Sequence, residues 1–338
     1  MRAVIGQQRL LDRLGAQAAR GEVAHAYGLF GPRGIGKRTV ALRLAQTVNC
    51  LEADRPAGGC GRCGSCLKIE RGGHPDVRLV ERAADKKDIA IEQIREMQTD
   101  LALRPLEGRI RVVIVDDAAE LNEFAQDALL KTLEEPPRHA LLLLLTRSPA
   151  ALRDTIRSRM QVLPFRLVAT AELAGALRER FGAGAERYAP PANGRPGLAI
   201  ALANDEQGIR AARRALEGEL YRLIGSGLTD RFAWAADLAD DNDSRRRAEA
   251  IDVRFDHWSE LLRDAAVAAR GLTDRPLRPD RASETGRLAA AVAPREIVDT
   301  ALLIERLRRD LFWNANARAM LELLVLRLPY VAGLGSAA

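Results

Sequence analysis

The sequence predicts an α/β domain with a parallel sheet, followed by an all-α region. Three observations predict this. Residues 1–166 alternate between short apolar runs and amphipathic stretches, which is the pattern of an α/β domain. A glycine-rich loop stands directly between the first apolar run and a helix. Strand signals vanish from about Val168, and from about Glu206 to Leu328 the apolar spacing is helical throughout.

Local signals place the elements of the first region. Helices are expected at 7–20, 38–48 and 152–159, and strands at 26–30, 110–115 and 141–145, with "HPDVRLV" (74–80) beginning another. Asn122 is expected to cap a helix that runs through Glu134 and is ended by Pro136 and Pro137. A small helical unit at 168–204 is interrupted by the loop "APPANGRPG".

The second region is expected to be a set of helices at 207–225, 228–239, 246–270, 281–291 and 295–327. Trp234, Trp258 and Trp313 are expected to be core or interface anchors rather than platforms for nucleic-acid bases, because they are sparse. Asn314 and Asn316 fall within the last expected helix, where they would fix a helix–helix register or lie in solvent.

Bulk composition excludes some classes of protein. The chain has 338 residues, too many for one typical core, and carries a formal charge of +6. That charge permits contact with nucleic acid, although no dense basic run stands out. No apolar run is long enough to cross a membrane, and the first residues lack the hydrophobic region of a signal peptide, so we expect a cytoplasmic location.

The loop "GPRGIGKRT" fits a phosphate-binding cradle. Backbone N–H groups around Gly31, Gly34 and Gly36 can turn toward an anion at the start of a helix, and Lys37 can reach its phosphates. The next residue normally gives a hydroxyl to Mg²⁺, but here it is Arg38, which has no acceptor atom. Thr39 does not obviously replace that hydroxyl, because one helical residue turns a side chain by about 100°.

Arg38 leaves three roles open: direct contact with a phosphate without Mg²⁺, exposure to solvent, or a place in a subunit interface. The strand "VVIV" ends at Asp116, which is placed to bind Mg²⁺ or its water. Asp117 follows where an active ATPase of this type commonly has Glu. These residues also fit a plain acidic loop after a strand.

All four cysteines fall between positions 50 and 66, as Cys50, Cys60, Cys63 and Cys66. Four thiolates from one short segment suit a closed, structural Zn²⁺ site, and the glycines at 58, 59, 61 and 64 permit the turns it needs. An iron–sulfur cluster and reduced or redox-active thiols stay open as alternatives. His74 is either a spare ligand or simply the start of a strand.

Several motifs occur in the order found in the clamp-loader subunits of bacterial DNA polymerase III, and the chain resembles that family. They are "HAYGLFGPRGIGKRT", the four-cysteine insert, "HPDV", "VVIVDDAAELN", "ALLKTLEEPP" and "IRSRM". The resemblance is strong over residues 1–166 and looser beyond. It is greatest to the delta-prime branch of the family, and next to the gamma/tau branch.

The resemblance implies an AAA+ P-loop module followed by a helical collar. Residues 1–166 would form a RecA-like domain with a zinc module at 50–66, residues 167–205 a helical lid, and residues 206–338 a collar for oligomerisation. Partners would be gamma/tau and delta subunits, and through the complex the sliding clamp and primed DNA, with no membrane. The complex would be a DNA-directed DNA polymerase holoenzyme, a nucleotidyltransferase complex, within which this chain has no strong ATPase or polymerase activity of its own.

Family motifs also imply roles for single residues. Arg159 of "SRM" would be an arginine finger for a neighbouring subunit's ATP, with Met160 in place of the family's Cys. The alternative, which the residues alone favour, is that Arg153, Arg157 and Arg159 line a solvated helix face. Gly31, Gly34, Gly36, Lys37, Thr39, Asp116 and Thr146 would form a degenerate nucleotide site, Thr146 as a sensor. Gly197 stands near where gamma/tau chains carry a sensor Arg, and Arg195 is nearby.

The favoured function is therefore a clamp-loader stator that completes a neighbour's ATPase site. Arg38 weighs against the alternative, an active gamma/tau-type motor. A third possibility is a zinc-dependent redox or regulatory P-loop protein, against which "ALLKTLEEPP" and "SRM" weigh.

Overall fold

The structure is a computed structural model, which describes residues 4–83, 86, 88–241, 243–272, 282–311, 316–332 and 334. The chain divides into two compact units, residues 1–200 and residues 201–338. In the described part of the chain, no helix combines the length and the apolar character needed to cross a membrane.

A five-stranded parallel sheet forms the centre of the first unit. Its strands are β1 (Ala26–Phe30), β2 (Val77–Val80), β3 (Arg111–Val115), β4 (Ala140–Thr146) and β5 (Gln161–Pro164), and their order across the sheet is β2-β3-β4-β1-β5. Strands β1, β3 and β4 are buried on both faces, which explains their nearly unbroken apolar sequences.

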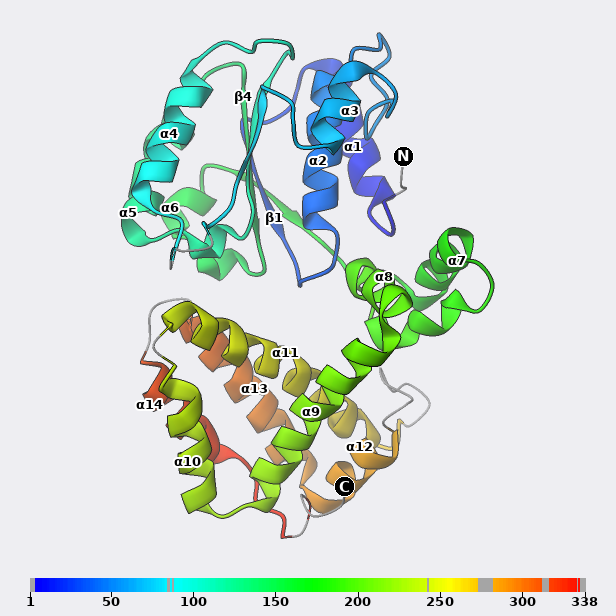
Figure 1. Cartoon of the computed structure of the whole chain (residues 1–338), viewed down its shortest axis with the longest axis vertical. Coiled ribbons are helices and arrows are strands. Elements are labelled where there is room, and N and C mark those ends of the chain that lie inside the picture. The colour runs from blue at the N-terminus through cyan, green and yellow to red at the C-terminus, as the bar shows by residue number, and fades with distance from the viewer. Residues whose placement is uncertain are drawn as a thin grey trace. The chain divides into compact units, whose positions relative to one another are not determined.

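Helices cover both faces of this sheet (Figure 1). On one face lie α1 (Gln8–Arg20), α2 (Lys37–Asn49) and α3 (Gly64–Glu70), and on the other lie α4 (Ile91–Ala102), α5 (Glu123–Glu134) and α6 (Asp154–Arg157). Alternate residues of β4 therefore enter different cores: Leu143 joins the core beneath α1 and α2, while Leu144 joins the core beneath α4 and α5. Asn122 caps α5 as expected, accepting a hydrogen bond from the N–H of Ala125.

The remainder of the first unit is helical. It consists of α7 (Thr170–Phe181), the short 3₁₀ turns Ala185–Tyr188 and Pro190–Ala192, and the beginning of α8 (Pro196–Asn204), which runs across the boundary between the units. The N–H of Gly197 in α8 donates a 2.7 Å hydrogen bond to the carbonyl of Gly34. The first turn of α8 thus rests directly on the glycine-rich loop after β1.

The second unit is made of helices around one apolar core. Its helices are α9 (Glu206–Gly225), α10 (Leu228–Ala239), α11 (Ser244–Ala268), α12 (Ala282–Ala291), α13 (Pro294–Leu311) and α14 (Ala317–Arg327). Helix α11 packs against α9, α12 and α13, and α10 packs against α14. Trp258 is fully buried, its ring centroid 5.6 Å from that of Trp234, so both are core residues as expected; Trp313 lies outside the described residues.

The predicted fold class, an α/β domain with a parallel sheet followed by an all-α region, is confirmed. Several predicted elements were wrong in detail. The single helix expected at 295–327 is two helices, and Asn316 does not sit within a helix but caps α14; Asn314 lies outside the described residues. Strand β2 begins at Val77 rather than His74, and the helix expected at 152–159 covers only Asp154–Arg157. Helices α3 and α4 and strand β5 were not predicted.

Candidate nucleotide and metal sites

The glycine-rich loop joins β1 to α2 at the carboxyl edge of the sheet. Gly34 has a φ of 75° and Gly36 a φ of 101°, a region of backbone space that favours glycine, and Gly36 is the N-cap of α2. The N–H of Gly31 donates to the carbonyl of Thr146 at 3.2 Å, which ties the loop to the end of β4. The loop has the shape of an anion cradle at a helix N-terminus.

Lys37 is folded back onto this loop. Its Nζ donates to the carbonyls of Gly31 at 2.6 Å and Pro32 at 3.2 Å. Burial lowers the pKa of Lys37 to about 8, against the opposite effect of Asp117. The ammonium group is therefore held where a phosphate can compete with the two carbonyls for it.

Arg38 pairs with two carboxylates. Its guanidinium contacts Glu81, just after β2, and lies 3.2 Å from Asp116, just after β3. None of the three roles considered from the sequence named this pairing. In P-loop NTPases the cation is held by a loop hydroxyl and a carboxylate after a strand. Here a guanidinium comes from the hydroxyl's position and contacts the carboxylate itself, so the residues do not fit a Mg²⁺ ion.

Asp117 is placed differently from Asp116. Its backbone is left-handed, with a φ of 58°, and its Oδ1 is buried without a hydrogen-bond partner among the described residues. Burial raises the pKa of Asp117, although the charges of Arg147, Arg33 and Lys37 act to lower it. This carboxyl is therefore buried within range of the charges of these three cationic side chains.

Two threonines of the expected site differ in exposure. Thr146 ends β4 beside Phe30 of β1 and is only 1% exposed, so it lies at the same sheet edge as the loop. Thr39, in the first turn of α2, is exposed.

Helix α8 meets the loop through backbone atoms. A Cβ at Gly197 would lie 3.0 Å from the Cα and the carbonyl oxygen of Gly34, so the approach is close because neither residue has a side chain. Arg195 is buried, and its Nε donates to the carbonyl of Ala192. At Gly197 the helix therefore contacts the loop through its backbone, and this position offers no cationic side chain.

The four cysteines come together as expected. Cys50 follows α2, Cys60 lies in the connecting loop, and Cys63 and Cys66 belong to the start of α3. Their sulfur atoms all lie within 4.8 Å of one another. A tetrahedral metal with metal–sulfur bonds of about 2.3 Å would place sulfurs about 3.8 Å apart, so the four thiols can hold a metal ion.

The loop between Cys50 and α3 is fixed by glycines and by α2. Gly58, Gly59 and Gly61 have positive φ values as expected, whereas Gly64 instead begins α3. A Cβ at Gly59 would lie 2.9 Å from the sulfur of Cys66, so only glycine fits there. Buried side chains of α2 hold the loop: Thr47 accepts from the N–H of Gly58, and Gln46 donates to the carbonyl of Cys66.

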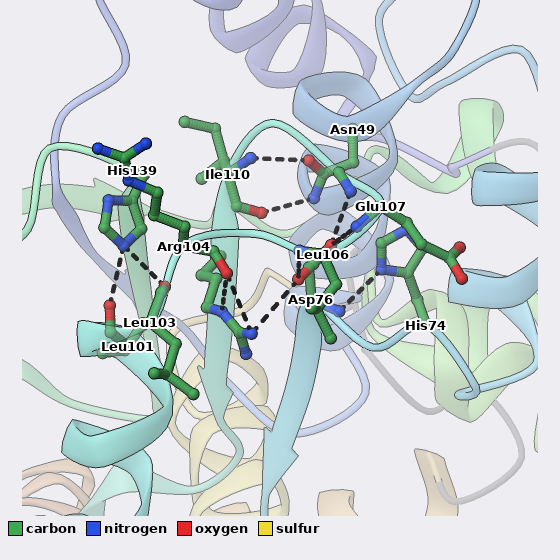
Figure 2. A network of polar contacts seen from close by, with 12 residues as sticks. Asn49, His74, Asp76, Leu101, Leu103, Arg104, Leu106, Glu107, Ile110 and His139 are labelled. Atoms are coloured by element: carbon green, nitrogen blue, oxygen red, sulfur yellow. Dashed lines mark hydrogen bonds and ion pairs between the residues drawn. The ribbon is translucent and has the colours of Figure 1, made fainter.

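Polar contacts join the cysteine module to the sheet (Figure 2). Both ring nitrogens of His74 have partners other than a metal: Nε2 pairs with Ser65 Oγ at 3.1 Å, and Nδ1 accepts from the N–H of Asp76. Burial lowers the pKa of His74, which favours this neutral ring. Asn49, immediately before Cys50, accepts from the N–H groups of Arg109 and Ile110.

Arg159 lies just after α6, away from the cysteines. Its guanidinium lies 2.9 Å from the carboxylate of Glu134 and donates to the carbonyl of Thr155, and its side chain is 37% exposed. Its own carbonyl is 3.1 Å from His25 Nε2. The neighbouring Arg153 and Arg157 also have acidic partners, in Asp127 and Asp154.

Sequence reasoning missed Glu81, Glu134 and His25. Each of these residues lies inside or beside a motif. The arginine that it contacts, Arg38 or Arg159, is distant in the chain, so the sequence pattern did not indicate the contact.

The comparisons with known proteins agree with the motifs of the first unit. Residues 6–169 match the family model described as DNA polymerase III, delta subunit. This stretch of the chain is therefore similar to that family. The DNA polymerase III subunit tau of Salmonella typhimurium is 28% identical over 321 residues, which are 91% of this chain and 47% of that protein. Subunit delta′ of Pseudomonas aeruginosa is 39% identical over 153 residues, 45% of either protein.

The chain spans about half the length of these relatives. Among solved structures, a gamma-subunit-related protein of DNA polymerase III from Thermotoga maritima aligns over 93% of this chain and 98% of that one, with 18% identity and a TM-score of 0.45.

Proposed function

We propose that this protein is a delta-prime-type subunit of a DNA polymerase III clamp loader, a stator that completes the ATPase site of a neighbouring subunit. The observation that carries the proposal is the pairing of Arg38 with Asp116 and Glu81. It places a fixed cation where a motor subunit needs Mg²⁺. The similarity to DNA polymerase III subunits tau and delta′ supports the family role, with gamma/tau and delta subunits as partners in loading a sliding clamp on primed DNA.

Arg159 is the residue that would act on the neighbour's ATP. Its guanidinium is partly exposed and is held from one side by Glu134, while His25 contacts the backbone carbonyl of the same residue. An arginine stays charged and can contact two phosphate oxygens at once, which suits the charge of a phosphoryl transition state. Glu134 and His25 would then be positioning residues.

Replacing Arg159 tests this role. In a ring assembled with its partner subunits, Arg159→Ala is expected to lower hydrolysis at the completed site by about 10³-fold, the usual range for an arginine finger. Arg157→Ala is the matched control, because Arg157 lies two residues before Arg159, at the end of α6, and pairs with Asp154 instead. Steady-state phosphate release measures both. Equal activity of the two variants would rule out the finger.

A gamma/tau-type motor is the second candidate. The match to subunit tau covers 91% of this chain, against 45% for the match to subunit delta′. The two candidates differ in the isolated chain: a motor hydrolyses ATP and loses this activity in Lys37→Ala, whereas a stator shows negligible turnover. Turnover that depends on Lys37 would favour the motor.

We further propose that the ion held by the four cysteines is structural zinc. Four sulfurs within 4.8 Å of one another suit a single tetrahedral ion better than a larger iron–sulfur cluster. The ion would fix the loop between α2 and α3, and it has no part in nucleotide chemistry.

Elemental analysis of the purified protein tests the metal. We expect about one zinc per chain, lost in Cys63→Ser because a site of three thiols binds zinc more weakly. Arg62→Ala is the control, since Arg62 is adjacent to Cys63 but is 79% exposed and pairs with Glu52. Iron, or no metal in the native protein, would contradict the proposal.

A further inference from the structure

The two carboxylates beside the phosphate loop are both engaged by one guanidinium. Asp116 follows β3 and Glu81 follows β2, and these strands are neighbours in the sheet. The same nitrogen of Arg38 contacts Glu81 and lies 3.2 Å from Asp116 Oδ2. Glu81 is itself held by its backbone, because its carbonyl accepts from Gln93 Nε2 at 3.0 Å.

A dication brought to Asp116 would meet this guanidinium. Arginine stays protonated at any pH a protein survives, so the repulsion cannot be relieved by loss of a proton. Arg38 also comes from the helix position whose hydroxyl normally completes the cation site. A single residue, Arg38, therefore removes both ligands of a Mg²⁺ ion: it replaces the loop hydroxyl, and it pairs with the carboxylate of Asp116.

Three further cationic side chains belong to the loop or to the segment beside it. Lys37 and Arg33 belong to the loop or the start of α2, and Arg147 follows β4, whose end is tied to the loop by the hydrogen bond from Gly31 to Thr146. Together with Arg38 they give the loop four cationic side chains from two segments, the loop with the start of α2 and the residue after β4. A nucleoside triphosphate placed on the loop would therefore find positive charge without bringing a metal.

We propose that Arg38 takes the place of the divalent cation, so that this chain binds a nucleoside triphosphate as the metal-free anion. The bound nucleotide is a fixed structural ligand. The inference deepens the proposed function and rests on it, because a site that does not turn over can dispense with Mg²⁺.

Equilibrium dialysis of the full chain with ATP, in EDTA and in excess Mg²⁺, tests the proposal. For the native protein we expect excess Mg²⁺ to weaken the apparent binding by about tenfold or more, because nearly all of the ATP then carries the ion that Arg38 repels. In Arg38→Thr, which restores a hydroxyl and releases Asp116, Mg²⁺ is expected to strengthen binding by about tenfold or more. Arg20→Thr, which removes an exposed partner of Glu22, is the control and keeps the native ratio.

The outcomes separate cleanly. Native binding that is equal in the two buffers or requires Mg²⁺, or no ATP binding in either buffer, overturns the inference, as does an Arg38→Thr protein that folds and whose binding Mg²⁺ does not strengthen. Arg38→Lys, which keeps the charge, is a second variant and should also bind ATP more weakly in excess Mg²⁺. None of these failures affects the ring assay with Arg159→Ala, whereas turnover by the isolated native chain would overturn the proposed function as well.

Discussion

Asp76 stands just before β2, at the edge of the sheet opposite the phosphate loop. Its carboxylate accepts hydrogen bonds from the N–H groups of Leu106, Glu107 and Gly108 at 2.6–2.8 Å, and lies 3.7 Å from Arg111. Burial acts to raise the pKa of Asp76, but these hydrogen bonds and Arg111 outweigh it and lower the pKa. One charged group therefore holds the backbone of residues 106–108, shortly before β3 (Figure 2).

Asp76→Asn is expected to lower the free energy of unfolding of the first unit by about 2–3 kcal/mol, because an amide cannot accept from all three donors. The native pKa is lower than the unfolded one, so this stability is present above the unfolded pKa of about 3.9 and is lost as pH falls toward the native value. Urea unfolding followed by circular dichroism, at neutral and acid pH, measures it. Asp100→Asn, at an exposed pair with Arg78, should change little.

Single residues also show where sequence reasoning stops. Local motifs whose spacing carries the geometry could be recognised as candidate sites: the glycine-rich loop with Lys37, and the four cysteines, whose sulfurs the structure brings together. The contact between Arg38 and Glu81 joins residues 43 positions apart, and it exists only because β2 and β3 are neighbours. Such a pairing has no signal in composition or periodicity.

Among the elements of the second unit, α10 holds two helix ends through one buried side chain. The guanidinium of Arg231 donates to five carbonyls: those of Leu223, Ile224, Val325, Leu328 and Pro329. These carbonyls lie at the ends of α9 and α14, where helices leave acceptors without partners. Burial lowers the pKa of Arg231, but the ring of carbonyls gives the charge its hydrogen bonds.

Arg231→Met is expected to lower the free energy of unfolding of the second unit by about 3–5 kcal/mol, since five buried acceptors lose their donor. All three tryptophans of the chain lie in residues 201–338, so their fluorescence during urea unfolding reports on this unit alone. Arg222→Met, an exposed position on α9, is the control and should stay within about 0.5 kcal/mol. A fluorescence midpoint shared by both variants would contradict the role given to Arg231.

Elements with strong apolar runs were predictable, and weakly patterned ones were not. Strands β1, β3 and β4 are buried on both faces and stand out in the sequence. Strand β5 has four residues, three of them exposed, so its sequence has no clear apolar pattern. The strand is identified only by its pairing with β1. The last two helices were predicted as one, because apolar spacing continues on both sides of Asn316. In the structure Asn316 caps a new helix.

At the scale of the whole molecule, the two units can be tested separately. Asp76 and Arg231 report on different units, while Lys37, Arg38 and Arg159 all belong to the first unit. The helical second unit was predictable as a class from its sequence, but its role as a collar stays a prediction. The chain also spans only about half the length of the relatives that it matches.

The order of the strands has a consequence for synthesis of the protein on the ribosome. β1 is the first strand to be made, yet its neighbours are β4 and β5, whose paired residues begin at Leu142 and Gln161. Both edges of β1 therefore stay unpaired while more than a hundred further residues are synthesised. During this time β2 and β3 can already pair with each other. Long-range pairing of this kind is slow and leaves apolar strands open to wrong partners. The phosphate loop, attached to the end of β1, can take its final form only after most of the first unit has left the ribosome.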